Sequence, residues 1–347
     1  MRRTQLGRTG IDVSAFCLGT MTFGTNTGED ESFRQLDASL DHGIDFMDTA
    51  EMYPVNPVRK ETVGGTEEII GRWIARTGRR NDYVIATKCA GENGSFVREG
   101  RPVDGNIIRE ACEGSLRRLR TDCIDLYQLH WPNRSSYHFR KIWNYDPSDQ
   151  DGDVTIQHAE DVMGALRDLV DQGKIRAFGL SNETAWGTMQ WLMAGERTGG
   201  PRVASIQNEY SPLCRMPYDG DMAELGGRED ITLLAFSPLA TGFVTGKYLD
   251  GALPQGSRHQ IAGGSPRSSA RLDEAVRAFM AVGGKHGIDP VHLAMAFCLQ
   301  RPFPCIPIFG ATTTDQLDHI AAGKDLRLSD EVMADLSAAN RTHPMPF

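Results

Sequence analysis

The stretch Phe46-Met47-Asp48-Thr49-Ala50-Glu51-Met52-Tyr53 joins the end of a short apolar run, Ile44 to Met47, to an acid and then to a tyrosine. Such a run reads as a buried strand of a parallel sheet, and the polar residues after it lie at the end of that strand. Similar runs alternate with amphipathic helical patterns along the whole chain. This alternation is typical of a parallel sheet whose strands are connected by crossover helices.

Eight such units are spread over the 347 residues without a linker-like break in composition. They predict a (β/α)8 TIM barrel that occupies residues 1–347 as a single domain. A doubly wound sheet would call for a Gly-x-Gly-x-x-Gly after the first strand, and the sequence contains none. The predicted strands are Ala15–Gly19, Phe46–Thr49, Tyr83–Thr87, Ile124–Leu129, Ala177–Leu180, Ser205–Asn208, Leu233–Phe236 and Ile306–Phe309. The predicted helices include Glu31–His42, Thr66–Ala75, Asn106–Leu119, Ala159–Gln172 and Thr184–Ala194, with Asp104-Gly105 and Asn182-Glu183 as helix-entry signals.

Four segments fall outside this β/α rhythm. Thr4–Val13 is predicted to be an N-terminal hairpin that closes one end of the barrel, and Asp330–Ala339 is predicted to be a C-terminal helix. Residues 131–158 and 237–268 are predicted to be long loops after the fourth and seventh strands. Loops of this length are usually functional or disordered, and in a barrel the loops after strands lie on the face where active sites form.

The composition excludes several classes of protein. A formal net charge of -9 argues against a nucleic-acid partner, because binding to phosphates requires a basic face. The seven cysteines are odd in number and include no Cys-x-x-Cys, so neither a disulfide framework nor a metal site is expected. No apolar signal core follows Arg2-Arg3, and no uncharged apolar run approaches the ~20 residues that span a bilayer. We therefore expect a cytoplasmic protein with no membrane partner.

Polar residues end most of the predicted strands, and on the active face of a barrel such residues converge. Each of them also has a purely structural interpretation: Asp48 with Lys88 as an ion pair, and His130 as a core histidine. Together with Tyr53, however, they indicate a catalytic group. The strand-end residues are Asp48, Lys88, His130, Ser181, Asn182, Gln207 and Ser237.

A lysine near a tyrosine affects the acidity of the phenol. An ammonium about 4 Å from the hydroxyl favours the phenolate by roughly 4 kcal/mol at an effective dielectric constant of ~20, which is an upper bound. Asp48 would hold Lys88 charged and partly offset this field. Tyr53 could then donate a proton to a developing alkoxide, while His130 donates a hydrogen bond to the carbonyl oxygen.

These residues stand in motifs that resemble those of the aldo-keto reductase superfamily. The motifs are Asp48-Thr49-Ala50-x-x-Tyr53, Ala86-Thr87-Lys88, Leu129-His130-Trp131-Pro132, Gly179-Leu180-Ser181-Asn182, Gln207-Asn208-Glu209-Tyr210 and Ser237-Pro238-Leu239-Ala240-x-Gly242. Their order and spacing match over essentially the whole chain. Within the superfamily the chain is similar to the Tas-like NADP(H)-dependent reductases and, more distantly, to potassium-channel β subunits.

The resemblance implies a role for each matching residue. Tyr53 would be the general acid, tuned by Lys88 and Asp48, and His130 would orient the carbonyl of a small-molecule substrate beside Trp131. NADP(H) would be the cofactor, because Thr312 and Gln316 match residues that contact the adenosine 2′-phosphate. The other implied cofactor contacts are Gly19, Thr20, Asp48, Ser181, Asn182, Gln207, Phe236, Ser237, Pro238, Leu239, Ala240, Gly242, Lys247, Arg258 and Gly310.

The chain departs from the family's pattern at the adenine. Relatives usually carry Glu-Asn shortly after the glutamine, and this chain has His319-Ile320. The loop Ser237–Tyr248 ends in Gly246-Lys247 like a P-loop, but Thr241 and Tyr248 break the Walker pattern. In the family this loop folds over the pyrophosphate.

Two other functions stay open. A Schiff-base aldolase would use Lys88 as its nucleophile, which needs a depressed lysine pKa, and Asp48 would oppose that. The resemblance to channel β subunits implies a low-turnover NADP(H)-binding regulatory subunit, but those proteins carry Asn where this chain has His130. The candidate substrate walls are Met21, Phe23, Trp131, Tyr137, Trp143, Tyr145 and Tyr210, and Arg134 or Arg140 could meet an anionic substrate. The sequence predicts neither the individual substrate nor the oligomeric state.

Overall fold

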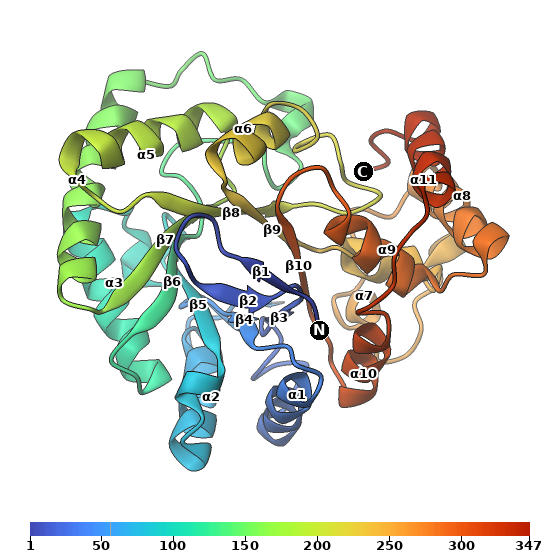
Figure 1. Cartoon of the computed structure of the whole chain (residues 1–347), viewed down its shortest axis with the longest axis horizontal. Helices are drawn as coiled ribbons and strands as arrows, with labels where there is room; N and C mark the ends of the chain where they lie inside the picture. Colours follow the sequence, from blue (N-terminus) through green and yellow to red (C-terminus); the bar gives the residue numbers. More distant parts are fainter. Residues whose placement is uncertain (56) are drawn as a thin grey trace.

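Eight parallel strands form a closed barrel, in the order β10-β3-β4-β5-β6-β7-β8-β9 (Figure 1). The structure is a computed structural model that describes residues 1–55 and 57–347. The fold is the predicted (β/α)8 TIM barrel, and all eight predicted strands are present within a few residues of their expected bounds. The strands are β3 Cys17–Gly19, β4 Phe46–Asp48, β5 Val84–Cys89, β6 Ile124–Leu129, β7 Ile175–Ser181, β8 Val203–Glu209, β9 Thr232–Phe236 and β10 Cys305–Phe309.

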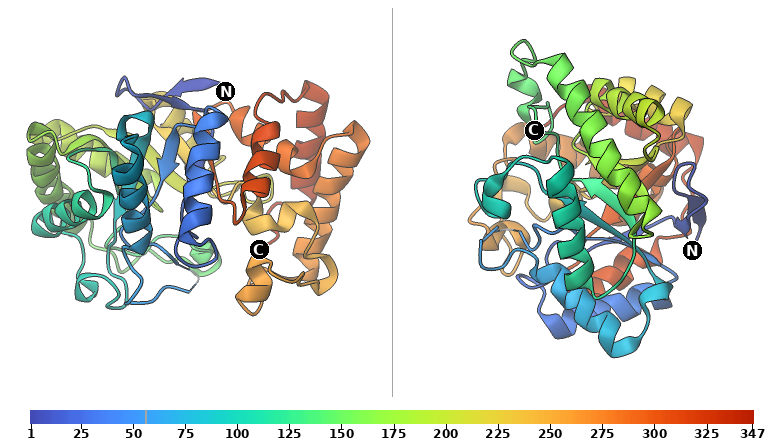
Figure 2. Two further views of the ribbon diagram at one scale, coloured as in Figure 1. Left: turned by 90° about the horizontal axis from the view of Figure 1, so that it is seen from below. Right: turned by 90° about the vertical axis from the view of Figure 1, so that its left-hand side faces the viewer.

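Helices surround the barrel and bury their apolar faces against its outer surface (Figures 1 and 2). The helices predicted from the sequence correspond to α1 Glu29–Asp41, α2 Gly65–Thr77, α3 Gly105–Leu119, α4 Gly152–Asp171, α5 Ala185–Thr198 and α11 Asp330–Thr342. Asp104 caps α3 as predicted, because its side chain accepts hydrogen bonds from the backbone of Asn106 and Ile107. For α5 the predicted entry signal was two residues early, since Thr184 is the N-cap. The remaining helices are α6 Asp221–Glu229, α7 Arg258–Ile261, α8 Ala270–His286, α9 Pro290–Leu299 and α10 Thr314–Ala322.

The predicted N-terminal hairpin consists of β1 Arg3–Gln5 and β2 Asp12–Ser14, paired antiparallel. It covers the end of the barrel at which the strands begin (Figure 2, left). Its buried side chains Leu6, Ile11 and Val13 form one apolar cluster with residues from all eight barrel strands. The barrel is therefore filled and covered at this end, which we call the base, and ligands can approach only the opposite end, the mouth.

Both long loops contain more regular structure than the sequence suggested. The loop after β6 ends at Asp151, whose side chain caps α4, so the first two turns of that helix lie inside the predicted loop 131–158. The loop after β9 contains two 3₁₀ helices, Ala240–Thr245 and Leu249–Gly251, and the short helix α7.

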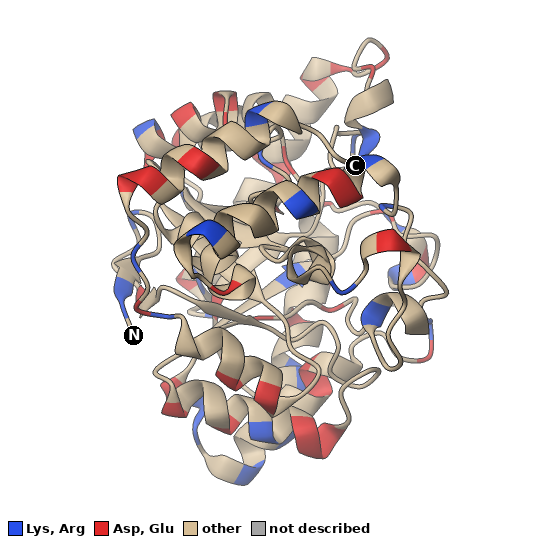
Figure 3. Ribbon diagram, turned by 90° about the vertical axis from the view of Figure 1, so that its right-hand side faces the viewer, with Lys and Arg blue, Asp and Glu red and all other residues tan. Residues whose placement is uncertain are grey.

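The side of the molecule that carries α8, α10 and α11 has both positive and negative surface charges. There lysine and arginine residues are interspersed with acids (Figure 3). None of the described helices is long and apolar enough to cross a membrane.

Candidate active site

A cavity of about 770 Å³ opens at the mouth of the barrel, where most of the predicted site residues meet. Thr20, Lys88 and Ala240 do not line it, since all three are fully buried behind its wall. The predicted residues that do line it are Gly19, Asp48, Tyr53, His130, Trp131, Ser181, Asn182, Gln207, Phe236, Ser237, Pro238, Leu239, Gly242, Lys247, Arg258, Gly310, Thr312 and Gln316.

Asp48 and Lys88 form a buried ion pair at the inner end of this cavity. Asp48 ends β4, and Lys88 is the penultimate residue of β5, which extends two residues beyond its predicted end at Thr87. Lys88 Nζ donates to Asp48 Oδ2 over 2.6 Å and to the carbonyl oxygen of Thr49 over 2.8 Å. Gln207 Nε2 donates to the other oxygen, Asp48 Oδ1, over 2.8 Å. Burial alone would lower the pKa of Lys88, but the charge of Asp48 raises it above its usual value.

Tyr53 lies directly over this ion pair, with Lys88 Nζ 4.9 Å from the centroid of its ring. The side chain is 9% exposed and lines the cavity. Burial raises the pKa of Tyr53; Lys88 opposes this, while Asp48 adds to it, and the pKa remains above its usual value. Lys88 acts on the pKa in the direction that the sequence predicts, and burial, which the sequence argument did not include, outweighs it.

His130 completes the predicted group of four. Its ring stands edge-on to that of Tyr53, with the ring centroids 5.8 Å apart and the planes at 78°. Burial and the nearby charge of Lys88 hold the pKa of His130 well below its usual value. The imidazole is therefore neutral at pH 7 and can donate a hydrogen bond without carrying a charge.

A second polar group extends from the ends of β7 and β8, where Ser181 pairs with Gln207 in the strand register. Ser181 Oγ donates to the carbonyl oxygen of Gln207 over 2.8 Å, and Asn182 Nδ2 donates to Ser181 Oγ over 3.0 Å. Asn182 Oδ1 is buried and has no hydrogen-bond partner within the described residues. A buried acceptor of this kind, beside the cavity, suits a ligand that brings an amide donor.

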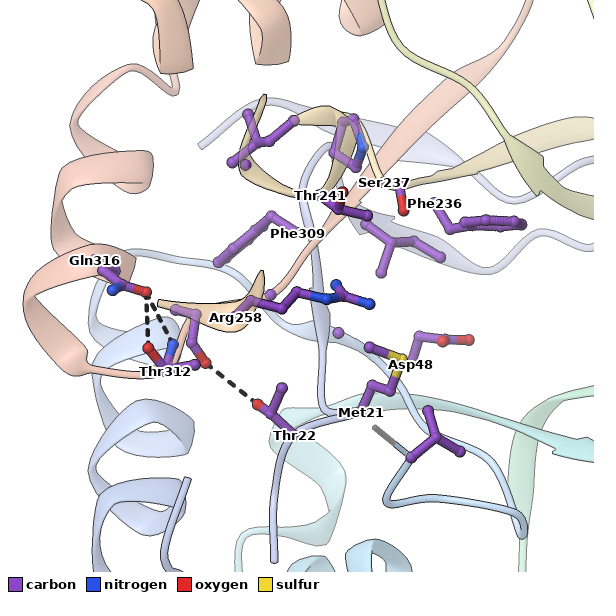
Figure 4. Close-up of a pocket in the computed structure, with 18 of the residues that line it drawn as sticks. Met21, Thr22, Asp48, Phe236, Ser237, Thr241, Arg258, Phe309, Thr312 and Gln316 are labelled. Carbon is purple, nitrogen blue, oxygen red and sulfur yellow. Dashed lines mark hydrogen bonds between the residues drawn. The ribbon is translucent and has the colours of Figure 1, made fainter. Parts of the chain in front are cut away.

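The loop after β9 forms one long wall of the cavity (Figure 4). Ser237, Ala240, Thr241 and Gly242 all have positive φ, between 47° and 95°. Lys247 and Arg258 line the cavity, and the Arg258 side chain extends across it toward Asp48 (Figure 4). This side of the cavity carries positive charge that suits an anionic ligand.

The turn between β10 and α10 forms the far end of the cavity. Both the backbone N and the hydroxyl of Thr312 donate to Gln316 Oε1, over 3.0 and 3.2 Å (Figure 4). Gly19 lies where β3 meets β10, and a Cβ there would stand 2.9 Å from Ile308 Cγ2, so a larger residue would require Ile308 to shift. His319 also lines this end of the cavity, and its ring stacks on that of His292 with centroids 5.0 Å apart.

The predicted substrate walls are partly right. Met21 and Trp131 line the cavity, whereas Phe23 and Tyr210 are fully buried in the core and do not line it. Tyr137 and Tyr145 pack on each other, and Trp143 is half exposed beneath Arg271. Arg134 is bonded to both carboxylate oxygens of Glu183, and Arg140 is absent from the cavity lining.

Three apolar side chains near the substrate end were missed, namely Met52, Val55 and Phe139. Met52 and Val55 flank the tyrosine that the sequence had singled out, so their proximity to Tyr53 was a usable signal. Phe139 had no such signal because it belongs to an irregular loop.

The chain also matches known proteins. Residues 15–341 match the profile of the Aldo/keto reductase family. The chain is 39% identical to Protein tas of Escherichia coli (strain K12), over 100% of this chain and 99% of that protein. It is 29% identical to Aldo-keto reductase yakc [NADP(+)] of Schizosaccharomyces pombe, over 93% of this chain and 86% of that protein. It is also 29% identical to a probable voltage-gated potassium channel subunit beta of Arabidopsis thaliana, over 92% of this chain and 90% of that protein.

Proposed function

Because this chain belongs to the aldo/keto reductase family and is thus an oxidoreductase, we propose that it reduces an aldehyde or ketone to the alcohol with NADP(H) as hydride donor. The observation that carries the proposal is Tyr53, whose phenol lines the cavity directly over the buried Lys88–Asp48 ion pair. A buried ion pair of this kind holds a charge in a fixed position beside a group that exchanges a proton.

In the proposed reaction Tyr53 donates its proton to the carbonyl oxygen as negative charge develops there. The raised pKa keeps the phenol protonated at pH 7, which is the form needed for reduction. Lys88 then stabilises the phenolate left behind, and Asp48 holds Lys88 charged and oriented. Neutral His130 donates a hydrogen bond to the same carbonyl oxygen, and Trp131 forms a wall for the substrate.

The cavity residues fit a nicotinamide dinucleotide, the cofactor type that the family generally uses. When bound, the nicotinamide supplies the hydride. Asn182, with its unpaired Oδ1, together with Ser181 and Gln207, would hold the carboxamide, and Phe236 would stack on the ring. The remaining predicted contacts that line the cavity, from Gly19 to the loop after β9, would hold the ribose and pyrophosphate, whereas Thr20 and Ala240 lie behind its wall.

We propose NADP(H) rather than NAD(H) on two grounds. Lys247 and Arg258 supply positive charge along one wall, and Thr312 and Gln316 stand together at the far end. A relative named for NADP(+) matches most of the chain. Equal catalytic efficiency with NADPH and NADH would overturn this assignment.

The Schiff-base aldolase is the weaker alternative. Lys88 is fully buried, does not line the cavity, and has a raised pKa, whereas a nucleophilic lysine needs an accessible, neutral amine. Borohydride treatment with an aldehyde should therefore leave Lys88 unmodified. The regulatory-subunit alternative is supported by the channel-subunit relative, and it predicts NADP(H) binding without significant turnover.

The test of the proposal follows NADPH absorbance with a panel of aliphatic, aromatic, dicarbonyl and ketosugar substrates. We expect oxidation of NADPH with at least one class, and loss of that activity in Tyr53→Phe while NADPH binding is retained. Turnover that persists in Tyr53→Phe would remove Tyr53 as the acid.

A further inference from the structure

The turn that carries Tyr53 is bound to strand β5 by more than the Lys88 ion pair. Lys88 Nζ donates to the carbonyl oxygen of Thr49, and the backbone N of Glu51 donates to the carbonyl oxygen of Lys88 over 3.3 Å. Tyr53 N donates to the carbonyl oxygen of Ala50 over 3.0 Å. The position of the Tyr53 phenol therefore depends on how this turn is held against the end of β5.

The Glu51 side chain provides a second charged connection. It is 3% exposed, and Oε1 accepts a hydrogen bond from the backbone N of Ala90 over 2.5 Å. Oε2 forms a salt bridge with Arg98, whose side chain is also buried. Arg98 Nη2 in turn donates to the carbonyl oxygen of Ala90 over 2.8 Å. Glu51 and Arg98 thus bind both backbone groups of the residue that follows β5.

The loop that this pair binds also contacts Trp131. Arg98 belongs to the loop that starts at Gly91, and Trp131 Nε1 donates to Glu92 O in that loop over 3.0 Å. A Cβ at Gly91 would stand 2.7 Å from Trp131 Nε1, so the contact is close. Trp131 lines the cavity beside His130. The ion pair is therefore linked to the proposed substrate wall through the backbone from Ala90, which it binds, to Glu92, which accepts from Trp131.

A buried ion pair often stabilises a fold no more than well-packed apolar residues would, so the place of this pair beside the Tyr53 turn points to a role besides stability. We infer that Glu51, together with Arg98, is a positioning residue that fixes the Tyr53 phenol relative to Lys88 and to the Trp131 wall. The inference rests on the proposed function, because it assigns Glu51 a role in proton transfer by Tyr53.

The first test is Glu51→Gln, which keeps the size of the side chain and removes its charge. We expect kcat for carbonyl reduction to fall ~10- to 100-fold, since a displacement of about 1 Å can cost that much. The Kd for NADPH should change by less than about 2-fold, because no Glu51 atom lines the cavity. The apparent pKa of the alkaline limb of the pH profile, at which kcat changes at high pH, should also shift.

A matched control is Asp125→Asn at the base. Asp125 Oδ2 accepts from the backbone N of Ile85, at the start of β5, and pairs with Arg80, so it repeats the contacts of Glu51 at the other end of the strand. It should lower stability without changing kcat or the alkaline limb. A loss of kcat in Asp125→Asn equal to that in Glu51→Gln would show that destabilisation alone is responsible, and would overturn the inference.

Two further measurements keep the inference testable. Should Glu51→Gln not fold, the double variant Glu51→Gln/Arg98→Met leaves no unpaired buried charge and should show the same loss of kcat. The titration of Tyr53, obtained as the ultraviolet difference from Tyr53→Phe, should move in either variant. Unchanged kcat and unchanged titration would refute the positioning role. If the wild type itself lacks carbonyl reduction, the proposed function fails, yet the titration still tests how Glu51 affects Tyr53.

Discussion

The two ends of strand β5 use the same chemistry for different purposes. At the base, Asp125 accepts a backbone N–H of β5 and pairs with Arg80 and Arg176. At the mouth, Glu51 accepts the N–H of Ala90 and pairs with Arg98. Around the base acid the neighbouring groups pair with one another, whereas at the mouth Asn182 Oδ1 and His130 Nδ1 are buried without partners in the described chain.

The unpaired groups at the mouth differ in what they face, because Asn182 and His130 line the cavity whereas Arg202 and Ser205, which also carry buried atoms unpaired among the described residues, do not. An unpaired buried polar atom costs roughly 1–3 kcal/mol, and backbone at positive φ in residues other than glycine adds to that cost. Both features occur at the mouth, in Asn182 and in the loop Ser237–Thr241. The base, with its hairpin and ion pairs, stabilises the barrel that holds them in position.

Tyr53→Phe should produce the largest effect and should act on activity alone. We expect carbonyl reduction to fall by a factor of ~10³, within the range that general acid catalysis contributes. The unfolding free energy should hardly change, because the ring and its packing remain. Steady-state assays beside urea unfolding measure both quantities. A stability loss as large as the activity loss would mean that the phenol is structural.

Asp125→Asn should have the opposite effects, lowering stability and leaving activity unchanged. Removing the charge leaves Arg80 partly buried without its partner, and the unfolding free energy should fall by about 3 kcal/mol. NADPH binding and kcat should stay within about 2-fold of the wild type, since Asp125 lies at the far end of the barrel. Urea unfolding and the reductase assay again provide the readouts. A loss of kcat without a loss of stability would show that the base also serves catalysis.

Acid pH should lower the unfolding free energy of the protein through two neutral histidines in the loops at the mouth. Burial lowers the pKa of His138 and of His259 to about 4 in each case. Below pH ~6.5 the unfolded chain binds protons that the folded chain does not, so stability falls as the pH falls toward 4, by up to about 1.4 kcal/mol per pH unit for each such histidine. Urea unfolding at pH 7.5 and 5.0 measures this slope. His138→Gln should reduce it, and an unchanged slope would exclude His138 as a contributor.

Ala240→Gly should have the smallest effect on stability, because relief of its positive φ offsets the loss of a buried methyl group. Ala240 is buried at φ 47°, a conformation that costs an ordinary residue about 1 kcal/mol and costs glycine little. Ala235→Gly in β9 is the matched control, where glycine should instead destabilise. If both variants lose stability equally, backbone strain is not a feature of the mouth loop.

The strand ends could be predicted because an apolar run that stops at a charged residue marks both a strand and its mouth. Asp48, Tyr53 and His130 were found in this way. Helix α9, Pro290–Leu299, was missed because it is buried on nearly all sides and therefore lacks an apolar stripe. The start of α4 was missed because its first two turns contain no buried residue and are mostly polar, so they show no apolar stripe.

Other features depend on the three-dimensional arrangement and could not be predicted from the sequence. An aromatic residue near a strand end can face the cavity or the core, so Phe23 and Tyr210 could not be separated from Trp131 by sequence. The direction of the pKa shift of Tyr53 depends on how much burial opposes the charge of Lys88. The sequence does not distinguish Glu51 from an ordinary loop acid, because its partners Ala90 and Arg98 are distant from it along the chain.

The hairpin at the base has a consequence for the kinetics. Since Leu6, Ile11 and Val13 close that end of the barrel, the cavity has no second exit through the barrel axis. Any molecule bound deep in the cavity must leave by the route through which it entered, past whatever still occupies the rim. Release of one ligand should therefore be slowed by the presence of the other, and the order of departure would be set by depth rather than by affinity.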